Sequence, residues 1–313
     1  MTYSKTIDYL YQNLPMFHRV GSVAFKKDLT NTIALCDVLG NPQAKFPTIH
    51  IGGTNGKGST AHMTAAILQS LGLKVGLYVS PHYRDFRERI KINGDYMSKK
   101  AVVQFVEKNR THFERIEPSF FEMTVAMAFD YFATEGVDVA VIEVGLGGRL
   151  DSTNVISPMI SVITNISLDH TDMLGDTLPL IAFEKAGIIK SETPVVIGEE
   201  HGETKPVFEQ KAIEMAQKQG YDYVICGHIH TPQYKTVGEV TYLNSGDWVE
   251  NLTALEYSYG TWSIYHYDNI DYDFINPKLQ VTKEPEFEED EQQMAASKAH
   301  LTDSTKKKPT RKY

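Results

Sequence analysis

The residues from Phe46 to Gly198 alternate apolar segments with amphipathic ones, and no other feature of the sequence limits the fold as strongly. Several apolar segments carry apolar side chains at nearly every position, as strands covered on both faces do. The segments between them have helical periodicity, and one is closed by Gly136. This alternation predicts an α/β fold with a doubly wound, mostly parallel sheet. The expected strands are Thr48–Ile51, Leu73–Ser80, Val137–Gly145, Met159–Ser167 and Pro194–Gly198, and the expected helices are Ser59–Leu71, Lys100–Arg115 and Glu122–Glu135.

The pattern changes after Gly198, where we expect a small, mixed, β-rich fragment. Short aromatic-rich segments there have the spacing of antiparallel strands. Beyond about Pro277 the chain is first acidic and then basic, which predicts a disordered, charged tail. The elements expected in the fragment are a helix over Val207–Gln219 and strands in Tyr221–Cys226, Glu239–Asn244 and Leu252–Tyr267.

Composition and charge narrow the functional class. The chain has 313 residues, a formal net charge of -9 and 42% hydrophobic residues, as an ordinary globular protein does. The negative charge disfavours general nucleic-acid binding, which requires a basic surface. The two cysteines lie far apart, the first residues lack a signal-peptide pattern, and no apolar run is long enough for a membrane span. We therefore expect a cytoplasmic protein.

A glycine-rich loop follows the first expected strand and leads directly into a helix. Such a loop places backbone N–H groups at a helix N-terminus, where they can bind a polyphosphate, and its glycines let the phosphates approach. Lys57 would reach the β- and γ-phosphates, although Gly58 separates it from the hydroxyl residue that usually follows. The alternative is a turn with one surface lysine, which the order of strand, loop and helix disfavours. The expected phosphate-binding residues are Gly53, Thr54, Asn55, Gly56, Lys57, Gly58 and Ser59.

Three polar residues fall at or near the ends of expected strands, at the edge of the sheet that carries this loop. They are Ser80, Glu143 and His170. Glu143 places a charge in a strand that should be buried, which is costly unless the charge is paired or binds a metal. Mg²⁺ bridging phosphate oxygens would explain it. A salt bridge for Glu143 and a loop-capping role for His170 are the alternatives for each residue taken singly.

Several motifs occur together in a fixed order. This arrangement resembles the folylpolyglutamate synthase/dihydrofolate synthase family of the Mur ligase superfamily, over roughly residues 3–210. The motifs are His50–Thr60, Ser80–His82 with Arg84–Ile90, Phe120–Glu122, Val141–Gly148, Asp151–Asn154, Leu168–His170 and Glu184–Lys190.

The resemblance implies an ATP- and Mg²⁺-dependent ligase that phosphorylates a carboxylate of dihydropteroate or tetrahydrofolate and then joins L-glutamate to it. It implies a monomer built on a P-loop central domain, here incomplete. Lys57, His170 and Lys185 take the catalytic positions, and Lys185 matches a lysine that can be carbamylated and join the metal site. From the sequence alone, Lys185 can equally be an ordinary helix-surface lysine. The positions that match substrate-binding segments are Phe120, Phe121, Glu122, Leu150, Asp151 and Ser152.

The segment over roughly residues 212–267 resembles a different family, the calcineurin-like metallophosphoesterases, and most closely UDP-2,3-diacylglucosamine pyrophosphatases. Gly220–Pro232 and Tyr242–Glu250 carry the likeness. His228 and His230 would be vestigial metal ligands, because no Asp or Gly of this chain completes the upstream motifs of a two-metal site. The alternative is a pair of loop histidines.

The expected organisation is therefore a ligase-like ATP-binding domain over 1–210, a phosphoesterase-like fragment over 211–276 and a tail over 277–313. Three functions are compatible with it. The first is a ligase whose turnover would be impaired without the family's C-terminal domain. The second is a phosphoesterase that takes its missing ligands from another chain. The third is a non-catalytic, nucleotide-binding hybrid. The nearly complete local phosphate site favours the first.

Overall fold

A computed structural model describes the chain outside residues 15–27, 200, 227–231, 248–250 and 268–313. It divides into two compact units, Met1–Tyr265 and His266–Tyr313. The helices and strands that the structure describes belong to the first unit, apart from the last residue of one strand. Within the described ranges, no helix combines the length and the hydropathy that a membrane crossing requires. The tail expected over 277–313 lies outside the described residues.

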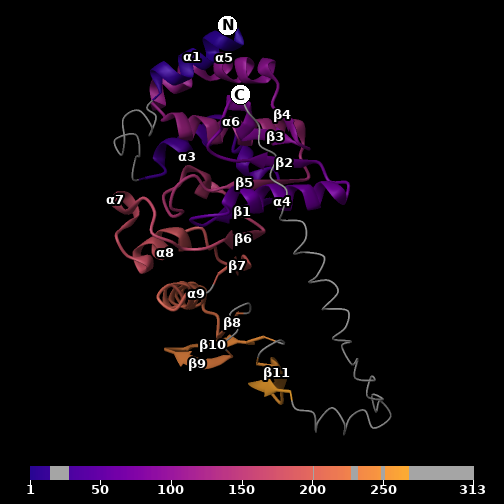
Figure 1. The fold of residues 1–313 in the computed structure, drawn as a ribbon, viewed down its shortest axis with the longest axis vertical. Helices are drawn as coiled ribbons and strands as arrows, with labels where there is room; N and C mark the ends of the chain where they lie inside the picture. Colours follow the sequence, from indigo (N-terminus) through magenta and orange to yellow (C-terminus); the bar gives the residue numbers. More distant parts are fainter. Residues whose placement is uncertain (15–27, 200, 227–231, 248–250, 268–313) are drawn as a thin grey trace, which may run out of the picture. The chain divides into compact units, whose positions relative to one another are not determined.

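A seven-stranded sheet forms the centre of the first unit. Its order is β4-β3-β2-β5-β1-β6-β7, and Figure 1 shows β3 to β7 stacked in this order. The pairs β2–β5, β5–β1, β1–β6 and β6–β7 are parallel, and the pairs β2–β3 and β3–β4 form an antiparallel edge. The predicted doubly wound, mostly parallel sheet is confirmed. The strands are β1 (Thr48–Gly52), β2 (Val75–Tyr78), β3 (Ile90–Ile92), β4 (Asp95–Tyr96), β5 (Val139–Glu143), β6 (Ile160–Ile163) and β7 (Val195–Ile197).

Helices cover this sheet. One face packs on Ala61 and Ala65 of α4, and the other packs mainly on α6, whose side chains are apolar almost all round. Every residue of β1 and β5 is buried, and β5 is a nearly continuous apolar run, whereas β1 also buries the polar Thr48 and His50. The described helices before β7 are α1 (Tyr3–Asn13), α3 (Thr30–Val38), α4 (Lys57–Ser70), α5 (Lys99–Ile116), α6 (Phe120–Glu135), α7 (Thr171–Leu174) and α8 (Leu178–Ala186), with short 3₁₀ turns η2 (Pro42–Ala44), η3 (Phe86–Arg89) and η4 (Ser152–Val155).

Helix α6 shows how local sequence sets these boundaries. Ser119 and Glu122 form a capping box at its start, and the left-handed Gly136 ends it. Phe132 on the same helix is fully buried, and a Cβ on Gly76 of β2 would lie 2.9 Å from its ring. Glycine at 76 therefore lets the helix approach the sheet closely.

The observed strands of the large sheet are shorter than the predicted ones, except β1, which extends one residue further, to Gly52. Strand β6 ends at Ile163, so Thr164–Ser167 belong to the connection that follows it, and β5 ends at Glu143. Helix α4 begins at Lys57 rather than Ser59, which places the lysine in its first turn. Apolar runs mark strand centres, whereas hydrogen bonding decides where a strand ends.

The region after β7 contains α9 (Lys205–Gln219), followed by small sheets. Strand β10 (Val240–Asn244) pairs in parallel with β8 (Tyr223–Cys226) and antiparallel with β9 (Gln233–Val237). A hairpin of β11 (Thr253–Ser258) and β12 (Thr261–His266) follows. This small, mixed, β-rich fragment matches the expectation.

The boundary expected between residues 210 and 211 falls inside α9. The helix is continuous across residues 210 and 211 and contacts two hydrophobic clusters. Phe208 and Met215 belong to the cluster around α8 beside the large sheet. Ile213 and Ala216 pack with Val240 and Tyr242 of the small sheet. The helix shows no structural break at residues 210 and 211. A junction there between segments derived from two different families stays a prediction.

Candidate functional site

The phosphate loop occupies the carboxyl end of β1, where the sequence places it. Gly53 and Gly56 have φ values of 134° and 80°, and α4 begins at the next residue, Lys57. A Cβ on Gly53 would lie 1.9 Å from Thr164 Oγ1, so only glycine fits there. Since the first N–H groups of a helix have no intrahelical acceptor, the loop and the start of α4 have the geometry that can receive an anion, and binding by these residues stays a prediction.

Two lysines share a backbone oxygen of this loop. Lys57 Nζ donates to the Gly53 and Thr54 carbonyl oxygens at 3.1 and 3.0 Å. Lys185 Nζ, from α8, donates to the Gly53 oxygen at 2.8 Å. Lys185 is 3% exposed, and burial together with the Lys57 charge lowers its pKa to about 8. The alternative of a helix-surface lysine is therefore wrong: two cations converge on the loop.

Glu143 lies beside the same loop. Its side chain is 4% exposed, and its Oε2 accepts a hydrogen bond from the Ser80 backbone N–H at 2.8 Å. A Cβ on Gly58, in the first turn of α4, would lie 3.6 Å from Oε1. Burial raises the pKa of Glu143, while the Ser80 N–H and the Lys57 charge act in the opposite direction. The structure thus places this buried carboxylate against the helix that begins at the phosphate loop, as expected.

His170 lies in the segment that follows β6. It has a left-handed φ of 47° and precedes α7, and its Nε2 lies 3.7 Å from Asp169 Oδ2. Within the described ranges, no three His, Cys, Asp or Glu side chains form a metal cluster by themselves. Mg²⁺ bound with nucleotide takes one or two carboxylates plus phosphate oxygens and water. Glu143 could supply such a carboxylate, and the roles of Glu143, Ser80 and His170 as metal ligands stay a prediction.

The residues expected on the substrate side form two neighbouring groups. A Cβ on Gly145 would lie 2.3 Å from the Phe121 ring and 3.0 Å from Asp151 Oδ2, so these two side chains meet over the turn that follows β5. Asp151 is buried and accepts hydrogen bonds from the N–H groups of Leu146 and Thr153 at 2.8 and 3.0 Å. The structure therefore assigns Asp151 a part in holding this turn.

The remaining substrate-side positions differ in accessibility. Phe120 and Ser152 are buried, whereas Leu150 is partly exposed. The Glu122 carboxylate accepts hydrogen bonds from the Ser119 N–H and from Asn31 Nδ2, so it is occupied at the start of α6. Contact of these residues with a substrate stays a prediction.

Two polar residues that sequence reasoning missed contact the phosphate loop directly. Thr164 Oγ1 donates to the Asn55 oxygen at 2.6 Å, and Asn165 Oδ1 accepts the Asn55 N–H at 2.8 Å. The sequence feature that could have identified them is the change from an apolar strand to the polar pair Thr164-Asn165, at the edge of the sheet that carries the loop.

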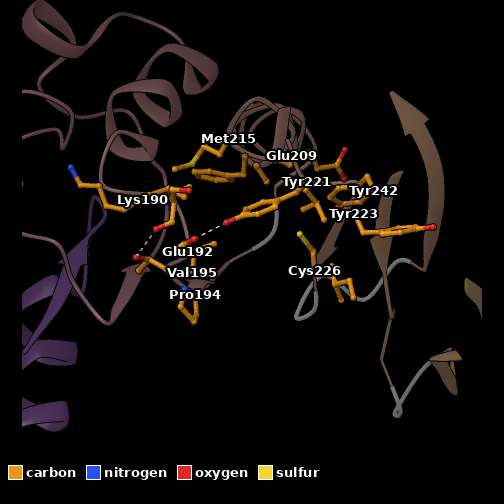
Figure 2. Close-up of a pocket in the computed structure, with 18 of the residues that line it drawn as sticks. Lys190, Glu192, Pro194, Val195, Glu209, Met215, Tyr221, Tyr223, Cys226 and Tyr242 are labelled. Atoms are coloured by element: carbon orange, nitrogen blue, oxygen red, sulfur yellow. Dashed lines mark hydrogen bonds between the residues drawn. The ribbon is translucent and has the colours of Figure 1, made fainter. Parts of the chain in front are cut away.

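A cavity of about 480 Å³ lies elsewhere, between β7, α9 and β8. Figure 2 shows Tyr221, Tyr223, Cys226 and Tyr242 around it, and the Tyr221 hydroxyl donates to Glu192 at 2.7 Å. Among the residues that the structure describes, none of the predicted site residues lines it. His228 and His230 lie outside the described residues.

Comparison with known proteins gives a consistent result. Residues 51–231 match the Mur ligase middle domain, a span that runs past the boundary expected at 210. The chain is 43% identical over 205 residues to the folylpolyglutamate synthase of Lacticaseibacillus casei, which covers 63% of this chain and 46% of that protein. Across the curated relatives compared, the chain spans less than half of each relative's length.

Solved structures agree with this match. A solved FPGS–AMPPCP–folate complex aligns with a TM-score of 0.64 and 38% identity, over 76% of this chain and 57% of that one. Mycobacterium tuberculosis folylpolyglutamate synthase complexed with ADP aligns with a TM-score of 0.60 and 38% identity, over 68% and 48% of the two chains.

Proposed function

The chain belongs to the Mur ligase family, since residues 51–231 match its middle domain, and from this premise we propose that it acts as an ATP-dependent acid–amino-acid ligase that adds L-glutamate to a folate or to dihydropteroate. The observation that carries the proposal is the convergence of Lys57, Lys185 and Glu143 on one glycine-rich loop. The relatives with folylpolyglutamate synthase or dihydrofolate synthase names support the substrate class.

ATP would bind with its phosphates at the loop and the start of α4. The resting hydrogen bonds of Lys57 go to the loop carbonyls, and a phosphate offers this ammonium a charged acceptor in their place. Phosphoryl transfer needs charge neutralisation and alignment more than covalent help from the protein. Lys57 and the backbone N–H groups would supply positive charge to the transferring phosphate.

Glu143, Ser80 and His170 would hold Mg²⁺ beside the phosphates. The metal would neutralise charge on the transferring phosphoryl group. Glu143 is suited to this because it is a buried carboxylate that lies against the first turn of α4. Lys185 has a pKa of about 8, so part of it is an uncharged amine at neutral to slightly alkaline pH, which is the form that can be carbamylated.

The reaction then proceeds in two steps. The substrate carboxylate attacks the γ-phosphorus, which releases ADP and forms an acyl phosphate. The amine of L-glutamate attacks the acyl carbon, and phosphate leaves from the tetrahedral intermediate as the amide forms and the amine loses its proton. Phe120–Glu122 and Leu150–Ser152 would contact the pterin side, with Phe121 and Asp151 adjacent over Gly145.

The proposal extends to the cellular context. The chain would act as a monomer in the cytoplasm on small-molecule substrates, and its net charge of -9 disfavours nucleic acid as a partner. On sequence resemblance alone, residues 212–267 would descend from a metallophosphoesterase without its activity. Manganese-dependent hydrolysis of bis-p-nitrophenyl phosphate that is lost in His228→Ala would overturn this last point.

The test of ligase function is product formation from dihydropteroate or tetrahydrofolate with ATP and L-glutamate, followed by mass spectrometry. We expect a glutamylated product that is absent without ATP and absent in Lys57→Ala. No ATP-dependent product from either acceptor would contradict the proposal.

A further inference from the structure

The phosphate loop is held by the segment that follows β6. Asn165 accepts two successive loop N–H groups: its backbone oxygen bonds Thr54 N at 2.9 Å, and its Oδ1 bonds Asn55 N at 2.8 Å. Thr164 Oγ1 donates to the Asn55 backbone oxygen of the loop at 2.6 Å and lies 3.3 Å from the backbone oxygen of Gly52, the last residue of β1. The peptide groups of Asn55 are therefore fixed on both sides by two adjacent side chains.

The same segment continues along the loop. Thr54 Oγ1 donates to the Ser167 oxygen at 3.2 Å and accepts the Ser167 N–H at 3.0 Å. Three residues later the chain reaches His170. The connection after β6 thus links the loop to the residue that is expected to bind the metal.

These contacts determine which loop groups can meet a phosphate. The N–H groups of Thr54 and Asn55 are already bonded to Asn165, so they are not available. The N–H groups at the start of α4 have no intrahelical acceptor and remain for the phosphates. Their direction depends on the peptides just before them, which Thr164 and Asn165 hold.

We propose that Thr164 and Asn165 are positioning residues that hold the phosphate loop in its nucleotide-binding conformation through their side-chain hydrogen bonds to Asn55. This inference rests on the proposed function, because it assigns these residues to the ATP site of the ligase. Neither residue needs to touch the nucleotide. Without them the loop must be ordered when nucleotide binds, and affinity falls by the cost of that ordering.

The test uses Thr164→Val, which keeps the shape of the side chain and removes the hydroxyl, and Thr164→Ser, which restores the hydroxyl. Titration calorimetry with Mg²⁺ and the nonhydrolysable analogue AMPPCP should show a dissociation constant about 5- to 10-fold higher for Thr164→Val. Thr164→Ser should stay within about twofold of wild type. Asn165→Ala should weaken binding as Thr164→Val does.

Thr193→Val is the matched control. Thr193 Oγ1 also donates to two backbone oxygens, those of Pro158 and Ser191, at 3.1 and 3.3 Å, and it lines the separate cavity. It should lower thermal stability about as much as Thr164→Val and leave AMPPCP affinity unchanged. A general loss of stability would not produce this difference between the two variants.

The outcomes separate this inference from the proposed function. Failure of the wild-type chain to bind AMPPCP would contradict the ATP site itself. Wild-type binding that Thr164→Val and Asn165→Ala leave unchanged would overturn the positioning role alone. If Thr164→Val does not fold, Asn165→Ala decides by the same change in affinity.

Discussion

Buried charged side chains have different partners at the carboxyl edge of the large sheet and in the region after β7. At the large sheet, Glu143 and Lys185 are buried without a carboxylate–ammonium pair between them, and Lys57 rests on backbone oxygens. After β7, the buried Glu209 is paired with Lys235. A buried carboxylate paired with an ammonium group, as in Glu209 and Lys235, serves the packing of its own region. Buried charges that are not paired with each other, beside the first backbone N–H groups of a helix, are suited to binding a charged ligand.

The strands show the same contrast. Every residue of β5 is buried, while the residues of β8 alternate between exposed and partly buried. A sheet covered on both faces can hold side chains rigidly at its edge, and a sheet covered on one face leaves half of its side chains in solvent. This difference predicts that the two regions will respond differently to equivalent substitutions.

The largest expected effect is on stability. Phe132→Ala removes a fully buried ring that packs against Gly76, and it should lower the free energy of unfolding by about 3–5 kcal/mol. Tyr257→Ala removes a ring that is 59% exposed and pairs with Trp262, so its cost should stay below about 1.5 kcal/mol. Chemical denaturation of both variants measures the difference. Equal losses would mean that the two regions are equally well packed.

The second effect concerns the metal. Glu143→Gln keeps an acceptor for the Ser80 N–H but removes the charge beside α4. The Mg²⁺ concentration needed for half-maximal nucleotide binding should rise by at least about tenfold. Glu209→Gln changes another buried carboxylate, in the region after β7, and should leave the Mg²⁺ requirement as it is in wild type. Titrations of Mg²⁺ at fixed ATP that gave the same result for both variants would remove Glu143 from the metal site.

The third effect is the titration of Lys185. Burial and the Lys57 charge lower its pKa to about 8 from 10.5, so the folded chain releases this proton before the unfolded chain does. The unfolded state then binds more protons between these two pH values, and Lys185 contributes increasing stability as pH rises from about 8 to 10.5. NMR of the ¹³Cε signal, assigned by its absence in Lys185→Arg, should show a midpoint near 8. A midpoint near 10.5 would show that Lys185 is not held in the buried position described.

Much of this arrangement could be predicted because it depends on local pattern. The apolar run of β5 indicates the sheet, and the glycines of the loop after β1 predict its nucleotide edge. The β3–β4 hairpin was missed because its strands are two and three residues long, too short for a periodic signal.

Other features depend on contacts between distant residues. The burial of Lys185 comes from packing of α8 against the loop, 132 residues away along the chain from Gly53. The bonds from Thr164 and Asn165 to Asn55 join segments more than 100 residues apart. Both residues read as part of a strand, because an apolar run does not show where a ladder of hydrogen bonds ends.

The central claim is that the loop from Gly53 to Ser59 binds ATP with Mg²⁺, and titration calorimetry of wild type, Lys57→Ala and Lys235→Ala tests it most directly. Lys235 is a lysine of the small sheet paired with Glu209, and it serves as the control. Lys57→Ala should weaken ATP binding about 10- to 150-fold, because a charge-assisted phosphate contact is lost. Lys235→Ala should bind as wild type does. Equal affinity of Lys57→Ala and wild type, or no Mg²⁺-dependent binding by the wild-type chain, would contradict the claim.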